Sequence, residues 1–292
     1  MTEVFDAPQI QTIRANGLEF AYYEAGQGPL VLLLHGFPDT ALCWRQVVPR
    51  LAAAGFRAVA PFLRGYAPTD LAPDGDYSLP TLGLDLLALI EHFNKGEKAY
   101  VVGHDWGAPI TQYAANLRPD RFEKIVVAAV PHLRRFLLSP SGAQLKRSHY
   151  IFKFQSPFWA ESRLPANDFE WVVENLIRRW SPGWNFSLGD IEPIKANFRE
   201  PARLKAALSY YRSLPGLLVN PSALKVAFSA VSVPTLAIYG TEDGAIGPEM
   251  FQKQQKRYRG PFELCEATGR GHFMQYEDPE WFADRVIEFF KA

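Results

Sequence analysis

Short apolar runs alternate with amphipathic stretches over the first 130 residues. The run Leu30–Leu34 is apolar throughout, as expected for a strand covered on both faces. Residues 79–93 instead place their large apolar side chains on one helical face. The pattern predicts further strands at 18–24, 56–60, 99–102 and 125–130, and helices at 41–53 and 106–117. Repeated β-turn-α units of this kind indicate an α/β protein with a mostly parallel central sheet flanked by helices.

The pattern changes in the middle of the chain. Residues 134–231 contain no clear strand and are rich in aromatic residues and proline, with helical segments such as 168–179 and 201–213 between Pro, Gly, Ser and Asn breaks. Strand-like runs resume at 235–239 and 262–264, before a helix at 279–290. We therefore expect a core in two parts, 1–133 and 232–292, with residues 134–231 inserted as a helical cap.

Composition and charge narrow the class of partner. The 292 residues include 31 basic and 31 acidic side chains, and the charges form no long basic run. Neither nucleic acid nor an anionic membrane is therefore expected as a partner, and the pair Arg134-Arg135 is interpreted as a solvated face. The longest apolar run is too short to span a bilayer. We expect a small-molecule partner and a monomer or homodimer.

The cysteines and the N-terminus bear on location. Cys43 and Cys265 form neither a CxxC pair nor a metal-ligand spacing, so two reduced thiols are expected, with a disulfide between them as the alternative. Residues 1–11 lack the basic and apolar stretches of a signal peptide. Both features favour a cytoplasmic protein.

The segment 103–107, Gly-His-Asp-Trp-Gly, lies between a predicted strand and a predicted helix. Small residues two before and two after a reactive residue are typical of a nucleophile elbow, with Asp105 where a serine often sits. The glycines suit a strained turn, and the helix N-terminus favours a negative charge beside it. The alternative is an ordinary turn in which Asp105 only caps the helix.

The order of the residues that follow Asp105 favours its interpretation as a nucleophile over that as a helix cap. Asp243 follows the strand at 235–239, and His272 lies in a Gly-flanked loop after the last strand. Nucleophile, acid and histidine in that order can form a triad in which the acid orients the histidine and the histidine activates water. Asp243 is preferred to Glu242, and a purely structural His272 is the alternative.

The segment His35-Gly36-Phe37-Pro38 follows the apolar strand Leu30–Leu34. In a fold with a nucleophile elbow, the loop at this place supplies one backbone N–H to an oxyanion hole, and the residue after the nucleophile supplies the other. The oxyanion-hole donors predicted here are therefore the amides of Phe37 and Trp106.

Together these motifs resemble the α/β-hydrolase-fold epoxide hydrolases, and the resemblance covers essentially the whole chain. It implies an α/β-hydrolase fold with a helical cap, and two cap tyrosines that hold and protonate the epoxide oxygen. Tyr150, in the run 150–157, matches the first tyrosine segment. Tyr211 is the better match to the second, with Tyr210 left open.

The resemblance implies an enzyme, a hydrolase acting on ether bonds, that needs neither a metal nor an organic cofactor. Asp105 would form an alkyl ester with a small apolar epoxide, and His272 with Asp243 would activate the water that releases a vicinal diol. The residues expected to contact substrate are His35, Phe37, Trp106, Tyr150, Phe154 and Tyr211.

Two other functions stay open. A haloalkane dehalogenase shares the ester intermediate but needs halide-binding donors, for which Trp106 and a cap tryptophan (Trp159, Trp171, Trp180 or Trp184) are candidates. A non-catalytic relative would only bind a small molecule, although such relatives usually lose a catalytic residue.

Overall fold

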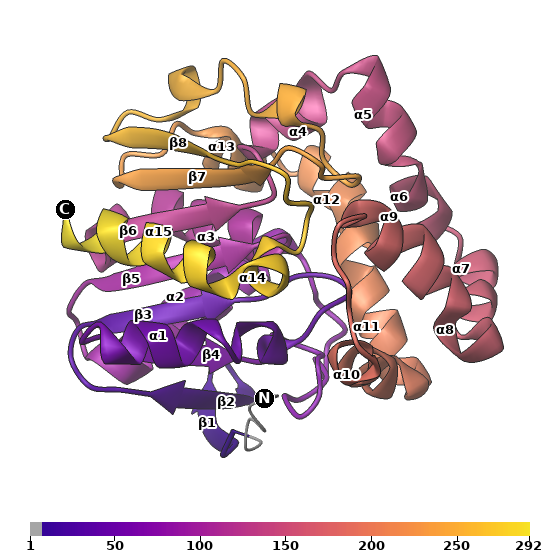
Figure 1. Ribbon diagram of the computed structural model, residues 1–292, viewed down its shortest axis with the longest axis horizontal. Coiled ribbons are helices and arrows are strands. Elements are labelled where there is room, and N and C mark those ends of the chain that lie inside the picture. Colours follow the sequence, from indigo (N-terminus) through magenta and orange to yellow (C-terminus); the bar gives the residue numbers. More distant parts are fainter. Residues whose placement is uncertain (1–7) are drawn as a thin grey trace.

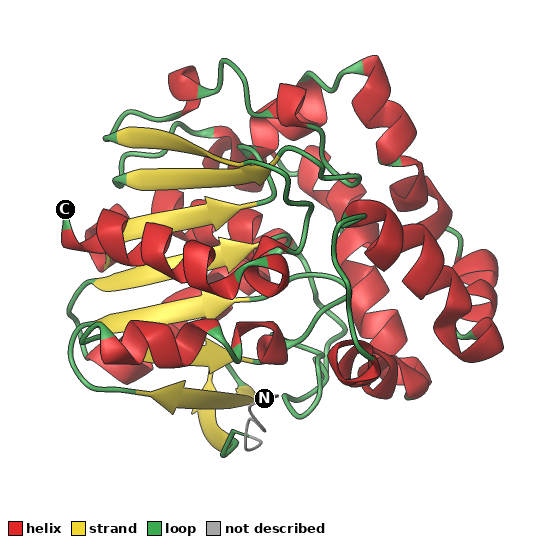
Figure 2. Ribbon diagram, in the orientation of Figure 1, coloured by secondary structure: helices red, strands yellow, loops and turns green. Residues whose placement is uncertain are grey.

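The computed structural model describes residues 8–292, which form an eight-stranded sheet with a helical layer on each face and a group of helices beyond one end of the strands (Figures 1 and 2). Residues 1–7 lie outside the described range. The prediction about a signal peptide was based on residues 1–11, so it falls mostly on residues that the structure does not describe. The strands are β1 (Gln11–Ala15), β2 (Leu18–Ala25), β3 (Leu30–Leu34), β4 (Arg57–Pro61), β5 (Ala99–His104), β6 (Phe122–Ala128), β7 (Thr235–Gly240) and β8 (Phe262–Ala267).

The strand order is β1-β2-β4-β3-β5-β6-β7-β8. Every pair from β4 to β8 is parallel, whereas β2 pairs antiparallel with both β1 and β4. All five side chains of β3 are buried, which explains its uninterrupted apolar sequence. The prediction of an α/β fold with a mostly parallel sheet is confirmed.

Helices cover both faces of the sheet (Figure 1). On one face α1 (Val47–Ala53) packs against α15 (Pro279–Lys291), and on the other α2 (Leu79–Asn94) packs against α3 (Gly107–Leu117). The apolar stripe of α2 is buried as its spacing predicts. The side chain of Asp278 accepts a hydrogen bond from the amide of Trp281 at 3.0 Å, which fixes the start of α15.

The region between β6 and β7 is helical throughout, as expected. Figure 1 shows its helices gathered beyond the ends of the parallel strands that point toward them. They are α4 (Leu133–Leu138), α5 (Gly142–Arg147), α6 (His149–Phe154), α7 (Pro157–Arg163), α8 (Ala166–Val172), η3 (Val173–Ile177), α9 (Arg178–Trp180), α10 (Leu188–Arg199), α11 (Pro201–Arg212), α12 (Leu214–Leu218) and α13 (Pro221–Phe228).

The last of these helices, α13, contacts α4 and α12 and also packs against α3 of the core. The side-chain amide of Asn116 donates hydrogen bonds to the carbonyl oxygens of Val226 and Ser229, each at 3.0 Å, which ties α13 to the core. The division into a core and a cap at residues 134 and 231 stays a prediction.

Three elements differ from the sequence-based expectation. Strand β1 was not expected, because this edge strand is mostly exposed and lacks an apolar run. The helix expected at 41–53 is divided into a 3₁₀ turn, η1 (Ala41–Trp44), and α1. The helix expected at 168–179 contains the π-helical turn η3.

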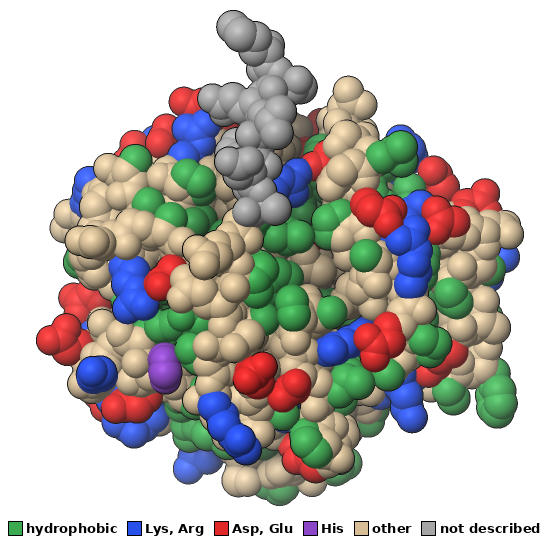
Figure 3. Space-filling model, turned by 90° about the horizontal axis from the view of Figure 1, so that it is seen from below, with side chains coloured by type: hydrophobic (Ala, Val, Ile, Leu, Met, Phe, Trp, Pro, Cys, Tyr) green, Lys and Arg blue, Asp and Glu red, His purple; other side chains and the backbone are tan. Residues whose placement is uncertain are grey.

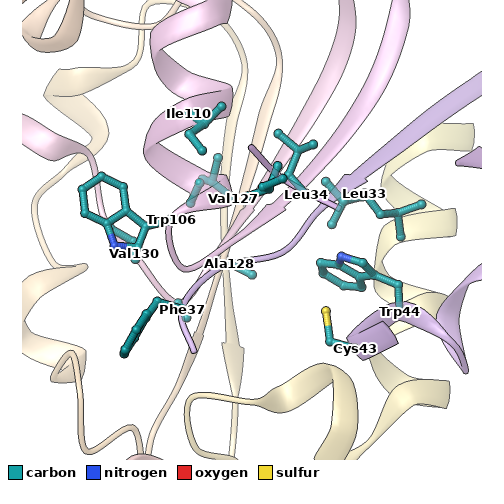
Figure 4. Close-up of a cluster of buried hydrophobic side chains, with 14 of the residues drawn as sticks. Leu33, Leu34, Phe37, Cys43, Trp44, Trp106, Ile110, Val127, Ala128 and Val130 are labelled. Atoms are coloured by element: carbon teal, nitrogen blue, oxygen red, sulfur yellow. The ribbon is translucent and has the colours of Figure 1, made fainter. Parts of the chain in front are cut away.

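Buried apolar side chains from several elements meet around the end of β5. Figure 4 shows Phe37, Trp106 and Val130 on one side of this cluster and Cys43 and Trp44 on the other. The large side chains of Phe37 and Trp44 are fully buried. The loops at the ends of β3 and β5 therefore rest on a packed core, which gives the residues in them fixed positions.

The surface agrees with the even balance of charge. Figure 3 shows basic and acidic side chains interspersed over one face, without a large area of a single sign. None of the helices among residues 8–292 is both long and apolar enough to cross a membrane. Cys43 and Cys265 are both free thiols.

Candidate active site

The turn between β5 and α3 has the geometry of a nucleophile elbow. Asp105 adopts a positive φ of 51°, which is uncommon for a residue other than glycine. A Cβ atom added at Gly103 would lie 2.2 Å from the carbonyl oxygen of Gly107, and one added at Gly107 would lie 2.3 Å from that of Leu34. Both glycines are therefore required for the chain to turn this tightly against its neighbours.

The carboxylate of Asp105 has two distinct oxygens. Oδ1 accepts a hydrogen bond from the backbone amide of Phe37 at 2.7 Å. Oδ2 lies 3.3 Å from Nε2 of His272. Asp105 is only 5% exposed, so this charge is held in a nearly dry place by one fixed donor and one imidazole.

His272 is oriented by Asp243, which is the acid preferred from the sequence. Nδ1 of His272 lies 2.8 Å from Oδ2 of Asp243. The other oxygen of Asp243 accepts hydrogen bonds from the amides of Ala245 and Ile246 at 2.7 and 2.9 Å, so the carboxylate cannot rotate freely. Glu242 is exposed. The structure thus brings together the three residues of the predicted triad.

Charge sets the protonation of this histidine. Burial by itself lowers the pKa of His272, but the adjacent carboxylates of Asp243 and Asp105 outweigh burial and raise the pKa to about 10. At this pKa, His272 is an imidazolium at neutral pH, with its Nε2 atom 3.3 Å from Oδ2 of Asp105.

Two residues that the sequence analysis did not assign hold the His272 loop. Nε2 of His104 donates to the carbonyl oxygen of His272 at 2.8 Å, and Gln275 donates to Nδ1 of His104 at 3.3 Å. Burial lowers the pKa of His104 to about 3, which keeps its ring neutral and the pattern of donors fixed. The position of His104, directly before the nucleophile, is the only sequence signal for this role.

The helical region also contacts the two loops. The carbonyl oxygen of Trp180 accepts hydrogen bonds from the amides of Gly244 and His272 at 3.1 and 3.0 Å. The Trp180 ring lies 5.1 Å from the ring of His272 and 5.0 Å from that of Tyr150, centroid to centroid. One short segment after η3 thus ties the acid loop to the histidine loop.

A cavity of about 40 Å³ opens beside Asp105 and is lined almost entirely by apolar side chains. Four predicted site residues line it: Asp105, Trp106, Tyr150 and Tyr211. Burial, reinforced by the negative charge of Asp105, raises the pKa of both tyrosines well above 10, so their phenols stay protonated. Among the described residues, the buried hydroxyl of Tyr211 has no hydrogen-bond partner.

The structure distinguishes the two adjacent tyrosines of α11. The hydroxyl of Tyr210 donates to the carbonyl oxygen of Arg64 at 2.8 Å and lies outside the cavity lining. Tyr211 lines the cavity. Of the two candidates, Tyr211 is therefore the one with a hydroxyl available to a ligand.

Three of the expected substrate contacts do not line the cavity. His35 is fully buried, with Nδ1 donating to Gly36 and Nε2 accepting from the amide of Leu63, so both ring nitrogens are occupied by backbone groups. Phe37 and Phe154 pack against each other at 5.3 Å behind Tyr211. These three side chains pack behind the residues that line the cavity, and their direct contact with a substrate stays a prediction.

Seven other residues complete the cavity wall, and the sequence analysis did not single them out. They come from the start of α3, the segment after β6, helices α4, α6 and α12, and the loop after β7: Pro109, Val130, Leu133, Phe136, Ile151, Leu214 and Ile246. Among residues 8–292, no group of three or more His, Cys, Asp or Glu side chains is arranged to hold a metal ion.

Known proteins similar to this chain agree with the fold. Residues 31–285 match the Alpha/beta hydrolase family, and the chain belongs to that family. The AB hydrolase superfamily protein YfhM of Bacillus subtilis is 30% identical, over 98% of this chain and 99% of its own length.

Within the family, the resemblance to the epoxide hydrolases is confirmed. Epoxide hydrolase A of Mycobacterium tuberculosis is 30% identical over 97% of each chain. The structure of potato (Solanum tuberosum) epoxide hydrolase I superposes with a TM-score of 0.83 at 28% identity, covering 98% of this chain and 99% of that one. By their names these two relatives are hydrolases of the expected class, which acts on ether bonds.

Proposed function

We propose that the protein is an epoxide hydrolase that converts a small apolar epoxide and water into a vicinal diol. One observation carries this proposal: Asp105 and the phenols of Tyr150 and Tyr211 face a single apolar cavity. A carboxylate nucleophile and two protonated phenols are the groups needed to attack one carbon of an epoxide and protonate its oxygen. The names of the relatives support the same reaction.

In the first step, Oδ2 of Asp105 attacks an epoxide carbon, because Oδ1 is held by the Phe37 amide. The carbon–oxygen bond of the ring breaks, and the oxygen takes a proton from Tyr150 or Tyr211 as it leaves. The imidazolium of His272 then gives up a proton, which restores the phenol and leaves the ring neutral for the second step. The product is a hydroxyalkyl ester of Asp105. Apolar walls exclude bulk water at this stage, which protects the ester from random hydrolysis.

In the second step, water attacks the ester carbonyl. His272, oriented by Asp243 at 2.8 Å, takes a proton from this water. The negative charge that develops on Oδ1 lies at the Phe37 amide, with the Trp106 amide as the second donor we propose. The tetrahedral intermediate then collapses as His272 returns a proton to Oδ2, which leaves with the diol. The water oxygen stays in Asp105, whose carboxyl proton passes to His272 and restores the resting pair of carboxylate and imidazolium. No metal or organic cofactor takes part.

The dehalogenase alternative receives less support from the cavity. Of the tryptophans considered as halide donors, only Trp106 lines it, whereas Trp159, Trp171, Trp180 and Trp184 do not. The second halide donor is therefore not supplied by any of the four cap tryptophans.

Mixing the protein with styrene oxide and measuring diol by chromatography tests the proposal. We expect diol from the wild type, none from Asp105→Asn, and an added mass of one substrate on His272→Gln, which would stall at the ester. Asp74→Asn, at an exposed aspartate, is the matched control. Halide release from 1-bromobutane without any diol would instead identify a dehalogenase, and no turnover of either compound would identify a binding protein.

We also infer a reducing, cytoplasmic location and a monomer or homodimer. The two free thiols, Cys43 and Cys265, support the location because reduced cysteines are typical of that compartment. Light scattering of the purified protein tests the assembly.

A further inference from the structure

A second hollow lies directly outside the candidate active-site cavity. This outer groove, of about 280 Å³, is formed by α4, α5, α6 and α12, and Leu145, Phe152 and Leu218 are among its walls. Three residues, Phe136, Ile151 and Leu214, line both the groove and the reactive cavity. The two spaces are therefore neighbours that share these three apolar side chains as walls.

The groove offers almost nothing to a polar ligand. None of the residues that line it carries a charge. The amide of Gln144 donates to Ser148 and Ala245 and accepts from Gly247, and the amide of Gln155 donates to the carbonyl oxygen of Tyr211. Because these side chains are already bonded within the protein, the groove favours an apolar occupant.

Two side chains at the groove are poorly covered by the protein. Leu145 is 52% exposed and Phe152 is 70% exposed. Exposing large apolar side chains to water is unfavourable, and a ligand that lies against them removes that exposure.

The reactive cavity is too small to enclose a whole substrate. Its volume of about 40 Å³ contrasts with roughly 300–1,000 Å³ for ordinary ligand pockets. A molecule whose epoxide ring reaches Asp105 must extend beyond this cavity, and the outer groove lies past Phe136, Ile151 and Leu214.

We propose that the substrate is an epoxide with an extended apolar tail, which passes between Phe136, Ile151 and Leu214 and lies in the outer groove. This inference rests on the proposed function and adds the class of epoxide. Three features favour a substrate tail as the occupant, rather than a separate ligand. The groove shares wall residues with the reactive cavity, its lining is apolar, and the reactive cavity is small.

A series of terminal epoxides from 1,2-epoxybutane to 1,2-epoxydecane, each kept below its solubility limit, tests the inference. Each methylene buried in the groove should raise kcat/KM about fourfold. We expect the decane compound to exceed the butane compound by at least about tenfold, with the gain ending when the tail reaches the end of the groove.

The variant Leu145→Glu places a charge on the groove wall at a partly exposed position, where a change of side chain leaves the core intact. We expect the decane-to-butane ratio of kcat/KM to fall about tenfold, the effect of about two methylenes that are no longer buried. Leu188→Glu, at an 85% exposed leucine of α10 outside the groove, is the matched control and should leave the ratio unchanged.

The outcomes separate this inference from the proposed function. Diol formation with a flat chain-length profile overturns the groove assignment and leaves the epoxide hydrolase proposal standing. Turnover of no epoxide overturns both. A flat profile together with sedimentation on phosphatidylcholine vesicles, lost in Leu145→Glu, would overturn the inference and assign the apolar rim to a lipid surface.

Discussion

At the scale of the residue, His272 must exist in two charge states during the proposed cycle. The carboxylates of Asp243 and Asp105 outweigh burial and raise its pKa to about 10, so the resting ring is protonated and cannot act as a base near neutral pH. Ester formation removes the charge of Asp105. The pKa of His272 then falls, and the ring can take a proton from water at the stage when the reaction requires it.

Replacing Asp105 by Asn mimics the charge of the ester. We expect the pKa of His272 to fall by about 1–3 units in this variant, the usual effect of one nearby charge. Titration of the imidazole by NMR measures the shift directly. Asp74→Asn, far from the site in sequence and exposed, should leave the titration curve as in the wild type. An unchanged curve in Asp105→Asn would mean that Asp105 does not control this proton.

At the scale of the element, α11 gives two adjacent tyrosines different environments. Successive residues of a helix point about 100° apart, since 3.6 residues make one turn. The Tyr210 hydroxyl is therefore directed to the carbonyl oxygen of Arg64, and the Tyr211 side chain is directed into the cavity. One hydroxyl stabilises the fold, and the other is free to meet a substrate.

Tyr210→Phe should lower the stability of the protein, whereas Tyr211→Phe should lower its activity. Loss of the Tyr210 hydrogen bond should lower the free energy of unfolding by about 1–2 kcal/mol, because the buried Arg64 carbonyl loses this donor. Loss of the Tyr211 hydroxyl should leave stability unchanged or higher, while single-turnover ester formation slows by roughly 10- to 100-fold. Urea unfolding and rapid-quench kinetics measure the two effects. A slower chemical step in Tyr210→Phe than in Tyr211→Phe would reverse the assignment.

The same element shows what the sequence can and cannot predict. Strands such as β3 were predictable because burial on both faces leaves an apolar run, and Asp105, Asp243 and His272 stand in short motifs. Tyr211 was preferred to Tyr210 only through the family resemblance, since both fit the local pattern, and the direction of α11 distinguishes them. Leu133 and Ile246 line the same cavity although they are 113 positions apart in the chain, and no local pattern encodes such an arrangement.

At the scale of the whole molecule, four buried histidines make stability depend on pH in two directions. Burial lowers the pKa of His35 and His132 to about 4 and of His104 to about 3, whereas an unfolded histidine titrates near 6.5. Below pH 6.5 the unfolded chain binds these three protons and the folded chain does not, so acid favours unfolding. The pKa of His272 is raised to about 10, so the stability that it contributes is complete below pH 6.5 and is lost between pH 6.5 and 10.

Among the carboxyl groups with a raised pKa, which also include Asp85 and Glu277, Asp39 has the large shift that opposes the three histidines on the acid side. Burial raises the pKa of Asp39 from 3.8 to about 7, so between pH 4 and 7 the folded chain holds a proton there that the unfolded chain has released. Between pH 6 and 5 the unfolded chain binds three protons at the histidines that the folded chain does not, and the folded chain binds one at Asp39 that the unfolded chain does not. Unfolding therefore takes up about two protons in this range.

The free energy of unfolding should therefore peak near pH 6.5 and fall by about 3 kcal/mol per unit between pH 6 and 5, the slope that two protons produce. Urea unfolding at closely spaced pH values measures this fall in the free energy of unfolding. His132→Asn removes one of the three protons at a residue outside the cavity lining and should reduce the slope by about half, whatever its effect on the absolute stability. His92→Asn, at an exposed histidine, should not change the slope. If the free energy of unfolding fell equally steeply between pH 6 and 5 in His132→Asn and the wild type, the buried imidazole of His132 would not stay neutral as the solution is acidified.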